Sequence, residues 1–161
     1  MIESPVTDLL NSNKIPFDVV VIPLSEDKKP IRHLEELLQA EGKDPDSVVR
    51  SLLFKTKTGK FVLLAVTGSG RADWAVLRQH LGERKLRMAE FDEIEQVTGY
   101  IVGAVPPIAL PEDIRVLADN SINSFDRVII GSGVLGYALS LSTSDLLSLL
   151  ADADTGQFIK Q

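Results

Sequence analysis

One stretch of sequence decides the fold: Val48-Val-Arg-Ser-Leu-Leu-Phe-Lys-Thr-Lys-Thr-Gly-Lys-Phe-Val-Leu-Leu-Ala-Val-Thr67. Two apolar runs, 48–56 and 61–67, flank a polar turn that contains Gly59, and this pattern predicts a β-hairpin. It is the clearest hairpin in the chain, and the other elements are placed around it.

The segments on either side of the hairpin alternate between helical and strand patterns. We expect helices over residues 6–13, 31–40, 73–81, 89–97 and 144–151, and short strands over 17–22, 86–88, 100–102, 114–118, 127–130 and 137–141. Several of these strands are joined by turns that are too short for a crossover helix. The sequence therefore predicts an α+β fold, in which helices pack on a mixed or antiparallel sheet.

The length of 161 residues fits a single domain over residues 1–151, followed by a polar, frayed tail over 152–161. A chain of this size buries about two thirds of its unfolded surface, so it needs no disulfide or metal to stabilise it. The longest apolar run, 62–66, is far shorter than the ~20 residues of a transmembrane helix. The N-terminus lacks the pattern of a secretory signal, and we expect a soluble, cytoplasmic protein.

The composition excludes several kinds of site. The absence of cysteine excludes disulfides, thiolate metal sites and a cysteine nucleophile. The two histidines, His33 and His80, cannot form a three-histidine metal site, and both are expected at the surface near helix ends. There is neither a P-loop nor a Gly-x-Ser-x-Gly elbow. Residues 131–136 fit Gly-x-Gly-x-x-Gly, but we expect a strand after them, which argues against a dinucleotide site.

Charge is distributed unevenly along the chain, whose net charge is −6. Residues 50–90 carry nine basic and three acidic side chains, whereas the segments on both sides are acidic. The basic side chains either present a binding face to an anionic partner or are ordinary solvated surface charges on a hairpin and a helix. Trp74 lies in the same segment and is expected in the core, half-buried, with stacking on RNA as the alternative.

Two glycine-containing turns, 103–107 and 131–136, lie between apolar strands. Glycine lets a backbone approach a ligand closely, and free amides in such a turn can hold a carbonyl oxygen or an oxyanion. Ordinary strand turns have the same composition, so the residues alone leave both interpretations open.

Four segments, in order, resemble the YbaK/prolyl-tRNA synthetase-associated domain, a family of aminoacyl-tRNA deacylases. They are Asp44-Pro-Asp-Ser-Val-Val-Arg-Ser-Leu-Leu-Phe-Lys55, residues 72–89, Thr98-Gly-Tyr-Ile-Val-Gly-Ala-Val-Pro-Pro107, and residues 119–147 with Val-Ile-Ile-Gly-Ser-Gly and Leu-Ser-Thr-Ser-Asp-Leu-Leu. The resemblance covers about residues 4–150. It implies a mixed, partly barrel-like β-sheet with surrounding helices.

The resemblance also implies an activity, the hydrolysis of the ester that joins a wrong amino acid to the 3′-terminal adenosine of a tRNA. It implies tRNA as a partner, an aminoacyl-tRNA synthetase as a second partner in some members, and neither a cofactor nor a metal. Amides of the glycine loops would hold the ester carbonyl, and a ribose hydroxyl of the substrate would help to activate the attacking group. The implied catalytic residues are Arg50, Gly103, Gly131, Ser132 and Gly133, and the implied substrate-binding residues are Ile22, Ala104, Pro106, Gly136 and Ala138.

The sequence departs from the family pattern at several of these positions. Arg50 stands where the family has a lysine, and an arginine still binds a phosphate but does not release a proton. Ala104 and Pro106 replace a glycine and a serine, and Pro106 lacks a backbone N–H. Ala138 replaces an aspartate, and Ile22 replaces a tyrosine. These changes make the expected pocket less polar and favour a small or apolar aminoacyl group.

The sequence leaves three functions open. In a trans-acting deacylase, Arg50 would position the terminal phosphate or the ester, Gly103 and residues 131–133 would line the pocket, and Ser132 would donate a hydrogen bond without being the nucleophile. The side chains expected to contact RNA are Lys55, Lys57, Lys60, Arg84 and Arg87. The second function is a non-catalytic module that binds aminoacyl-tRNA, an amino acid or a nucleotide in a regulatory protein. The third is a hydrolase of free esters or amides.

Overall fold

The computed structural model describes residues 2–23, 34–40 and 42–160. The helices are α1 (Pro5–Ser12), α2 (Leu34–Ala40), α3 (Trp74–Leu81), α4 (Phe91–Thr98) and α5 (Thr143–Leu149), with short 3-10 helices at Pro45–Ser47 and Asn120–Ser124. The strands are β1 (Asp18–Val21), β2 (Val49–Thr56), β3 (Phe61–Thr67), β4 (Leu86–Met88), β5 (Arg115–Asp119), β6 (Arg127–Gly131), β7 (Tyr137–Ser142) and β8 (Asp154–Gly156).

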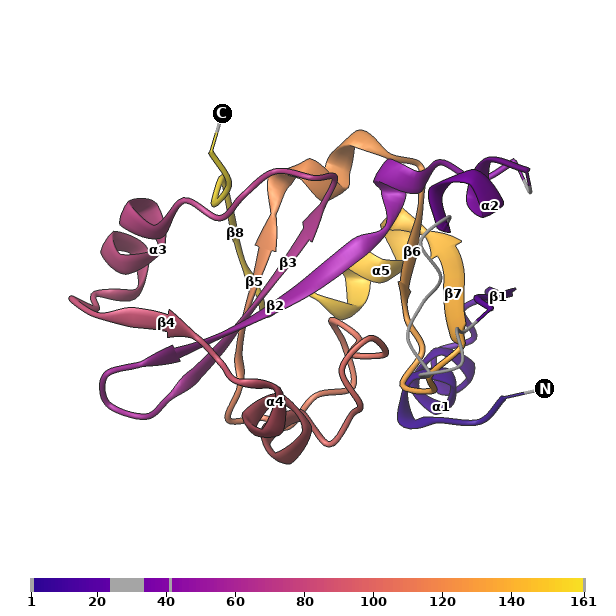
Figure 1. The fold of residues 1–161 in the computed structure, drawn as a ribbon. Helices are drawn as coiled ribbons and strands as arrows, with labels where there is room; N and C mark the ends of the chain where they lie inside the picture. The colour runs from indigo at the N-terminus through magenta and orange to yellow at the C-terminus, as the bar shows by residue number, and fades with distance from the viewer. Residues whose placement is uncertain (1, 24–33, 41, 161) are drawn as a thin grey trace.

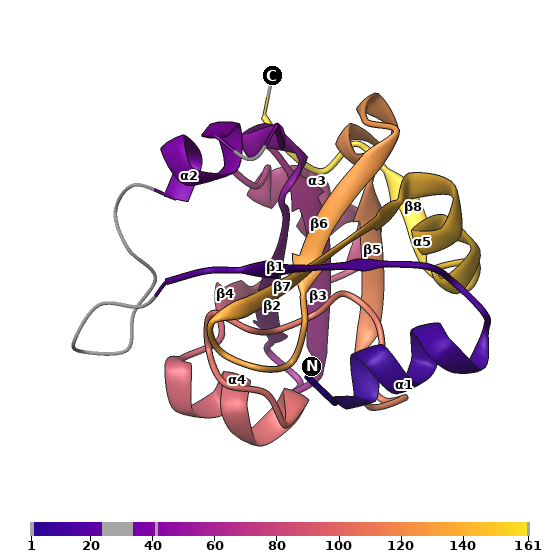
Figure 2. The ribbon, with the colours of Figure 1, turned by 90° about the vertical axis from the view of Figure 1, so that its right-hand side faces the viewer.

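The strands form two sheets (Figure 1). The larger sheet has the order β4-β2-β3-β5-β8 and mixes antiparallel pairs with the parallel pairs β3–β5 and β5–β8. The smaller sheet, β1-β7-β6, is antiparallel, and Figure 2 shows β1 running across the strands of the larger sheet. A parallel bridge between Val48 and Ile129 connects β6 to the start of β2. The α+β prediction is confirmed, and within the described residues the two sheets do not close into a barrel.

The β2–β3 hairpin forms as predicted, with Val49 opposite Thr67 and Lys55 opposite Phe61. Its turn closes through a hydrogen bond of 2.9 Å from the Thr56 amide to the Lys60 carbonyl. Alternate side chains along a strand point to opposite faces of the sheet. Val49 and Leu53 accordingly pack into one hydrophobic core and Phe54 into another.

The two cores lie on opposite faces of this hairpin. The larger core includes side chains of β2, β6 and β7 together with α1 and α5, and it fills the space between the sheets. The smaller core contains Phe54, Leu77 of α3 and Phe158. Trp74 packs edge-on against Phe54 with ring centroids 5.1 Å apart, which confirms the prediction that it is half-buried core.

Side-chain caps determine where the helices begin. Ser4 accepts a hydrogen bond from the Thr7 amide at 3.2 Å, and Ser142 accepts one from the Asp145 amide at 3.1 Å. Near the end of α3, His80 lies 3.1 Å from a carboxylate oxygen of Asp154, so this histidine is at a helix end, as predicted. His33 lies outside the described residues.

Two local predictions are wrong. Residues 100–102 form a turn instead of a strand, since the Tyr100 hydroxyl donates to the Ala109 carbonyl at 2.6 Å and folds the segment back on itself. The end of the chain is not a frayed polar tail, because β8 pairs with β5 and Phe158 is only 2% exposed in the smaller core. The Phe158 amide also donates to a carboxylate oxygen of Asp119 at 2.7 Å.

The segment that follows residues 131–136 is strand β7, as predicted, and not the helix of a dinucleotide-binding motif. Across the described part of the chain, no helix combines the length and the apolar character that a membrane crossing requires.

Candidate functional site

A cavity of about 270 Å³ opens beside the first half of β2, the end of β6 and the start of β7. Its wall is mostly apolar, and only three of its side chains are polar. The lining residues are Ile22, Leu38, Val48, Val49, Arg50, Ser51, Leu53, Ile94, Val102, Gly103, Val105, Ile129, Ile130, Gly131, Tyr137 and Ala138. A small apolar cavity with few polar groups suits a ligand that is mainly apolar and is oriented by one or two hydrogen bonds.

Arg50 contributes a cation to this cavity. It pairs with Val66 across the hairpin, and its Nη2 donates a hydrogen bond of 2.6 Å to the Gly70 carbonyl. Its Nε is buried and has no partner. A guanidinium has five N–H donors, so Arg50 retains donors for a ligand after it has bound Gly70.

Ser51 lies on the opposite face of β2 from Arg50, together with the cavity residues Val49 and Leu53. Its hydroxyl oxygen is buried without a hydrogen-bond partner, as is that of Thr67 on the paired strand. Buried hydroxyls in proteins almost always have a partner. Within the described residues, all the unpartnered buried side-chain atoms belong to Arg50, Ser51 and Thr67. Of these residues Arg50 and Ser51 line the cavity, where a ligand or water can complete their hydrogen bonds.

The two glycine loops meet. A β-carbon on Gly131 would lie 2.5 Å from the Val105 carbonyl oxygen, so the end of β6 packs directly on the backbone of the 103–107 loop. The Gly133 amide donates to the Ala104 carbonyl at 2.9 Å. Gly133 has a φ of +85°, and its Cα faces the ring of Tyr100. These contacts require glycine at both positions and hold the two loops at a fixed separation.

Several backbone amides of the first loop are free to bind a ligand. The Ala104 amide donates to the Ile101 carbonyl at 3.0 Å, whereas those of Val102, Gly103 and Val105 donate to no acceptor among the described residues. All three of these residues line the cavity. Amide donors beside an apolar cavity are groups that can stabilise a carbonyl oxygen as it gains negative charge.

Ser132 and Gly133, which the sequence predicted to line the aminoacyl pocket, are not among the residues that line this cavity. Ser132 is completely buried, and its hydroxyl lies 2.7 Å from the Tyr137 carbonyl and accepts from the Val134 amide at 3.0 Å. Its carbonyl accepts from the Ser4 hydroxyl at 2.6 Å. The polar groups of Ser132 are therefore used to hold the 131–136 loop, and the Gly133 amide is used to hold the other loop.

The predicted substrate-binding residues divide into two groups. Ile22 and Ala138 line the cavity, and their side chains make its wall apolar. Ala104, Pro106 and Gly136 are outside the lining. Ala104 and Pro106 are buried within their loop, and the Gly136 carbonyl accepts from the Ile22 amide at 2.8 Å, so these three residues shape the loops around the cavity.

A second hollow, of about 620 Å³, has a cationic lining, and we call it the basic groove. It is lined by Lys55, Thr56, Lys57, Arg78, Arg84, Lys85, Leu86 and Arg87. Four of the five residues predicted to contact RNA lie here, whereas Lys60 is in the hairpin turn and is not part of the lining. The lining contains six cations and no carboxylate, which suits an anionic ligand.

Glu93 of α4 orders one edge of the basic groove. Arg87 donates to both of its carboxylate oxygens, at 2.8 and 3.0 Å, and Lys55 donates at 3.1 Å. The hydrogen bonds from Arg87, from the Glu90 amide and from Lys55 hold the pKa of Glu93 far below its usual range. Within the described residues no carboxylate forms an ion pair with the other four cations, Lys57, Arg78, Arg84 and Lys85.

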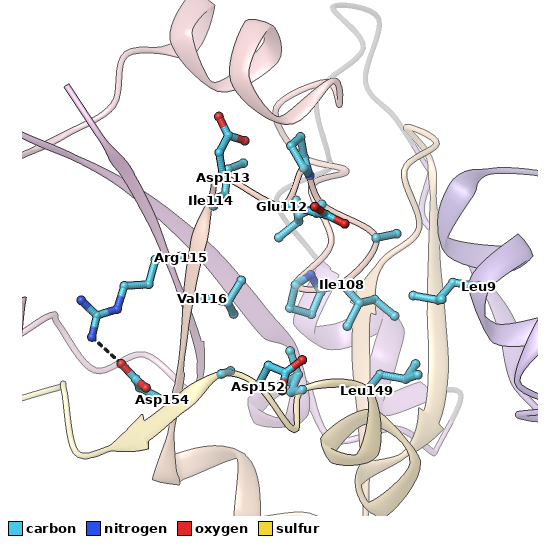
Figure 3. A pocket seen from close by; sticks show the side chains of 16 residues that line it. Leu9, Ile108, Glu112, Asp113, Ile114, Arg115, Val116, Leu149, Asp152 and Asp154 are labelled. Atoms are coloured by element: carbon cyan, nitrogen blue, oxygen red, sulfur yellow. Dashed lines mark hydrogen bonds and ion pairs between the residues drawn. The ribbon is translucent and has the colours of Figure 1, made fainter.

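A third hollow, of about 500 Å³, lies between residues 107–116 and the end of α5 (Figure 3). Four carboxylates line it, and Arg115 binds one of them, that of Asp154, at 2.5 Å. Hydrogen bonds from Arg115 and His80 lower the pKa of Asp154. The acidic surface repels phosphate groups, so this hollow does not fit RNA. Among the residues that the structure describes, no group of three or more His, Asp and Glu side chains is placed to hold a metal ion.

Sequence reasoning missed several residues of these two sites. Ser51 could have been found from strand alternation, because it shares the face of β2 that carries Val49 and Leu53. Arg78 and Lys85 belong to the basic segment that the charge distribution had indicated, but nothing local separated them from the other cations. No sequence pattern indicates that the Val105 amide lacks an acceptor, because this depends on how the loop folds.

The sequence model of the aminoacyl-tRNA editing domain matches residues 28–149 of this chain. The chain belongs to the aminoacyl-tRNA editing domain family. The resemblance drawn from the four segments is thereby confirmed. Proline–tRNA ligases carry similar segments: that of Brachyspira hyodysenteriae is 32% identical over 105 residues, and that of Thermotoga maritima is 32% identical over 110 residues. These matches cover 65% and 68% of this editing domain but only 18% of each ligase, so the chain spans about a fifth of their length.

Solved structures show the same fold. A crystal structure of a "putative trans-editing enzyme for prolyl tRNA synthetase" superimposes on the editing domain with a TM-score of 0.77 and 22% identity, over all of both chains. A crystal structure of a hypothetical protein gives a TM-score of 0.81 with 23% identity, over 98% of this chain and 100% of the other.

Proposed function

We propose that this editing domain hydrolyses the ester bond of a mischarged tRNA, with the amino acid held in the 270 Å³ cavity. The observation that carries the proposal is the set of unused amides at Gly103 and Val105, which line the same apolar cavity as Arg50. Membership of the editing-domain family supports the class of substrate, and the fold of the trans-editing neighbour agrees with it.

The cavity offers what ester hydrolysis needs apart from the water itself. Water attacks the carbonyl carbon, and the amides of Gly103 and Val105 hold the carbonyl oxygen while it bears negative charge. The bond from that carbon to the ribose oxygen then breaks, the ribose oxygen takes up a proton, and the amino acid leaves as the free acid. Arg50 stays protonated, so it binds the terminal phosphate or the ester, and a ribose hydroxyl of the substrate relays the proton.

The lining favours a small or apolar amino acid. The volume of about 270 Å³ lies just below the ~300–1,000 Å³ of pockets that hold drug-sized ligands. Ile22 and Ala138 contribute no hydrogen bonds from their side chains, whereas the Ser51 hydroxyl is available to one polar group of the substrate. We infer that this hydroxyl binds the α-amino group or the ester.

The partners in this proposal are tRNA and, upstream of the reaction, the aminoacyl-tRNA synthetase whose errors are removed, in the cytoplasm. Phosphates of the tRNA would bind the cations predicted from the sequence, of which Lys55, Lys57, Arg84 and Arg87 line the basic groove. Lys60 would make at most a peripheral contact from the hairpin turn.

Deacylation of a panel of aminoacyl-tRNAs (Ala, Ser, Thr, Cys and Pro among them) tests the proposal, with Arg50→Ala as the control. We expect one or two of these amino acids to be released by the wild type, and most of that activity to be lost in the variant. A second candidate function, a non-catalytic binding module, is favoured by the arginine at position 50, where the family has a lysine. Tight binding of a non-hydrolysable aminoacyl-adenosine, together with no turnover of any aminoacyl-tRNA in the panel, would support that module and refute the deacylase. Turnover of aminoacyl esters that carry no RNA would instead indicate a hydrolase of small esters.

A further inference from the structure

We propose that the basic groove and the exposed side chain of Phe91 form the path along which the unpaired 3′ end of the tRNA enters the cavity, with Phe91 stacking on a base of that strand. The inference rests on the proposed function for the identity of the RNA. It adds a base-stacking residue outside both hollows, Phe91, that neither the family match nor the sequence indicated.

The cavity and the basic groove follow each other along one strand. On β2, Leu53 lines the cavity and Lys55, two residues later, lines the groove. Ser51 of the cavity and Lys55 of the groove share one face of β2 and are separated by four steps of ~3.3 Å along an extended strand, or ~13 Å. A stacked nucleic-acid strand advances ~3.4 Å per nucleotide, so about four nucleotides span this distance. A short single strand thus reaches from the groove to the cavity.

The backbone just before Phe91 lies where these two hollows adjoin. The Ala89 amide donates to the Leu53 carbonyl at 2.9 Å, which places the end of β4 beside the border between cavity and groove. Phe91 follows two residues later as the first residue of α4, the helix that comes directly after β4 in the chain (Figure 1). The same helix supplies Glu93 to the edge of the groove and Ile94 to the cavity.

Packing within the fold does not explain why Phe91 is so exposed. Its side chain is 74% exposed, the highest value among the large apolar side chains that the structure describes as exposed. An aromatic ring in water beside a row of cations is the arrangement that single-strand-binding proteins use, in which cations bind phosphates and rings stack on bases. Glu90 and Asp92 flank Phe91 in sequence and disfavour a phosphate there, so a base fits this position better than the backbone does.

Binding of two uncharged RNA hairpins tests the inference, one ending in a single-stranded NCCA 3′ end and the other blunt. We expect Phe91→Ala to weaken binding of the first hairpin about tenfold and to leave the second unchanged, because stacking involves only unpaired bases. Phe91→Trp restores binding. Val76→Ala, which shortens an exposed apolar side chain on α3, is the matched control and has no effect.

The cations of the groove act through phosphates of the unpaired strand. Replacing Arg84 and Lys85 by alanine weakens binding of the NCCA hairpin, and it lowers the slope of log affinity against log salt by about 0.7 for each phosphate contact that is lost, whereas Phe91→Ala leaves this slope unchanged. This effect distinguishes phosphate binding in the groove from base stacking at Phe91.

Equal affinity of wild type and Phe91→Ala for the NCCA hairpin overturns the inference, as does a Phe91→Trp variant that binds no better than Phe91→Ala. If the wild type binds neither hairpin at low salt but does bind an acidic peptide, the groove is assigned to a protein partner instead. If Phe91→Ala weakens binding of the NCCA hairpin but the wild type deacylates no aminoacyl-tRNA, only the proposed enzymatic activity is refuted. Deacylation at unchanged kcat/KM in Phe91→Ala would refute only this path.

Discussion

A β-carbon on Gly131 would lie 2.5 Å from the carbonyl oxygen of Val105. Two such atoms do not approach so closely, so β6 and the 103–107 loop touch only because residue 131 has no side chain. Both residues line the cavity, and Val105 also carries one of the unused amides. The position of this amide therefore depends on glycine at position 131.

Gly131→Ala should displace the 103–107 loop and abolish deacylation. Overpacking of this kind costs about 1–3 kcal/mol of stability, measurable by urea unfolding. Gly59→Ala is the matched control: nothing lies within 4 Å of its added carbon, and its left-handed backbone costs about 1–2 kcal/mol without touching the cavity. A Gly131→Ala protein with wild-type activity would show that the loop position does not matter for the reaction.

Ser51→Ala should reduce activity while leaving the fold as stable as the wild type or slightly more stable. The buried hydroxyl has no partner in the free protein, so its removal relieves a desolvation cost of about 1–3 kcal/mol. Thr67→Val removes the other unpartnered hydroxyl, which does not line the cavity, and should stabilise without a loss of activity. Thermal unfolding and deacylation rates check both variants, and a fully active Ser51→Ala protein would contradict the proposed contact.

Arg50→Ala should lower the deacylation rate by about two orders of magnitude, the loss that follows removal of one charge-stabilising donor from other sites. Arg50→Lys should keep much of the activity because the positive charge remains. Since Arg50 also binds the Gly70 carbonyl at 2.6 Å, the thermal midpoint of each variant has to be measured beside its rate. An Arg50→Ala variant that is folded and fully active would exclude a role for Arg50 in positioning the substrate.

Glu93 should make stability depend on acid pH. Its pKa in the folded protein is far below the ~4.3 of an unfolded chain, so its contribution is complete above that value and is lost as the pH falls. The stability difference between wild type and Glu93→Gln should therefore be largest near neutral pH and shrink below about pH 5. A difference that stays constant from pH 7 to pH 3 would contradict the pairing of Glu93 with Arg87 and Lys55.

Phe158→Ala should cost about 3–5 kcal/mol in urea unfolding, as expected for a fully buried aromatic side chain. The larger core and the cavity do not include this residue, so the activity of the folded fraction should be unchanged. A loss below 1 kcal/mol would mean that the segment after β8 is not docked in solution.

The predictions from sequence succeeded where structure is local. The β2–β3 hairpin depends on a turn at Gly59, and α3 and α5 depend on caps at Asp73 and Ser142, all within a few residues of the elements that they define. β8 was missed because its partner, β5, lies far away in the sequence, and nothing near Phe158 indicates which core it enters.

The site could be predicted only in part for the same reason. Resemblance located Arg50, Gly103 and Gly131, and it located the apolar substitutions at Ile22 and Ala138 that line the cavity. It assigned Ser132 to the pocket as well, because chain position alone does not reveal that its hydroxyl is used inside its own loop. The free amides and the unpartnered Ser51 hydroxyl are properties of the folded backbone, and only the structure shows them.

The central claim is that the cavity catalyses ester hydrolysis rather than only binding the aminoacyl end. Its most direct test is the release of free amino acid from aminoacyl-tRNA that carries a small apolar amino acid and is present in large excess over the protein. We predict release of many equivalents per protein molecule, at a rate that falls to the uncatalysed level in Gly131→Ala. Release that stops at one equivalent, or stays at the uncatalysed rate while the protein binds the tRNA, would contradict the claim.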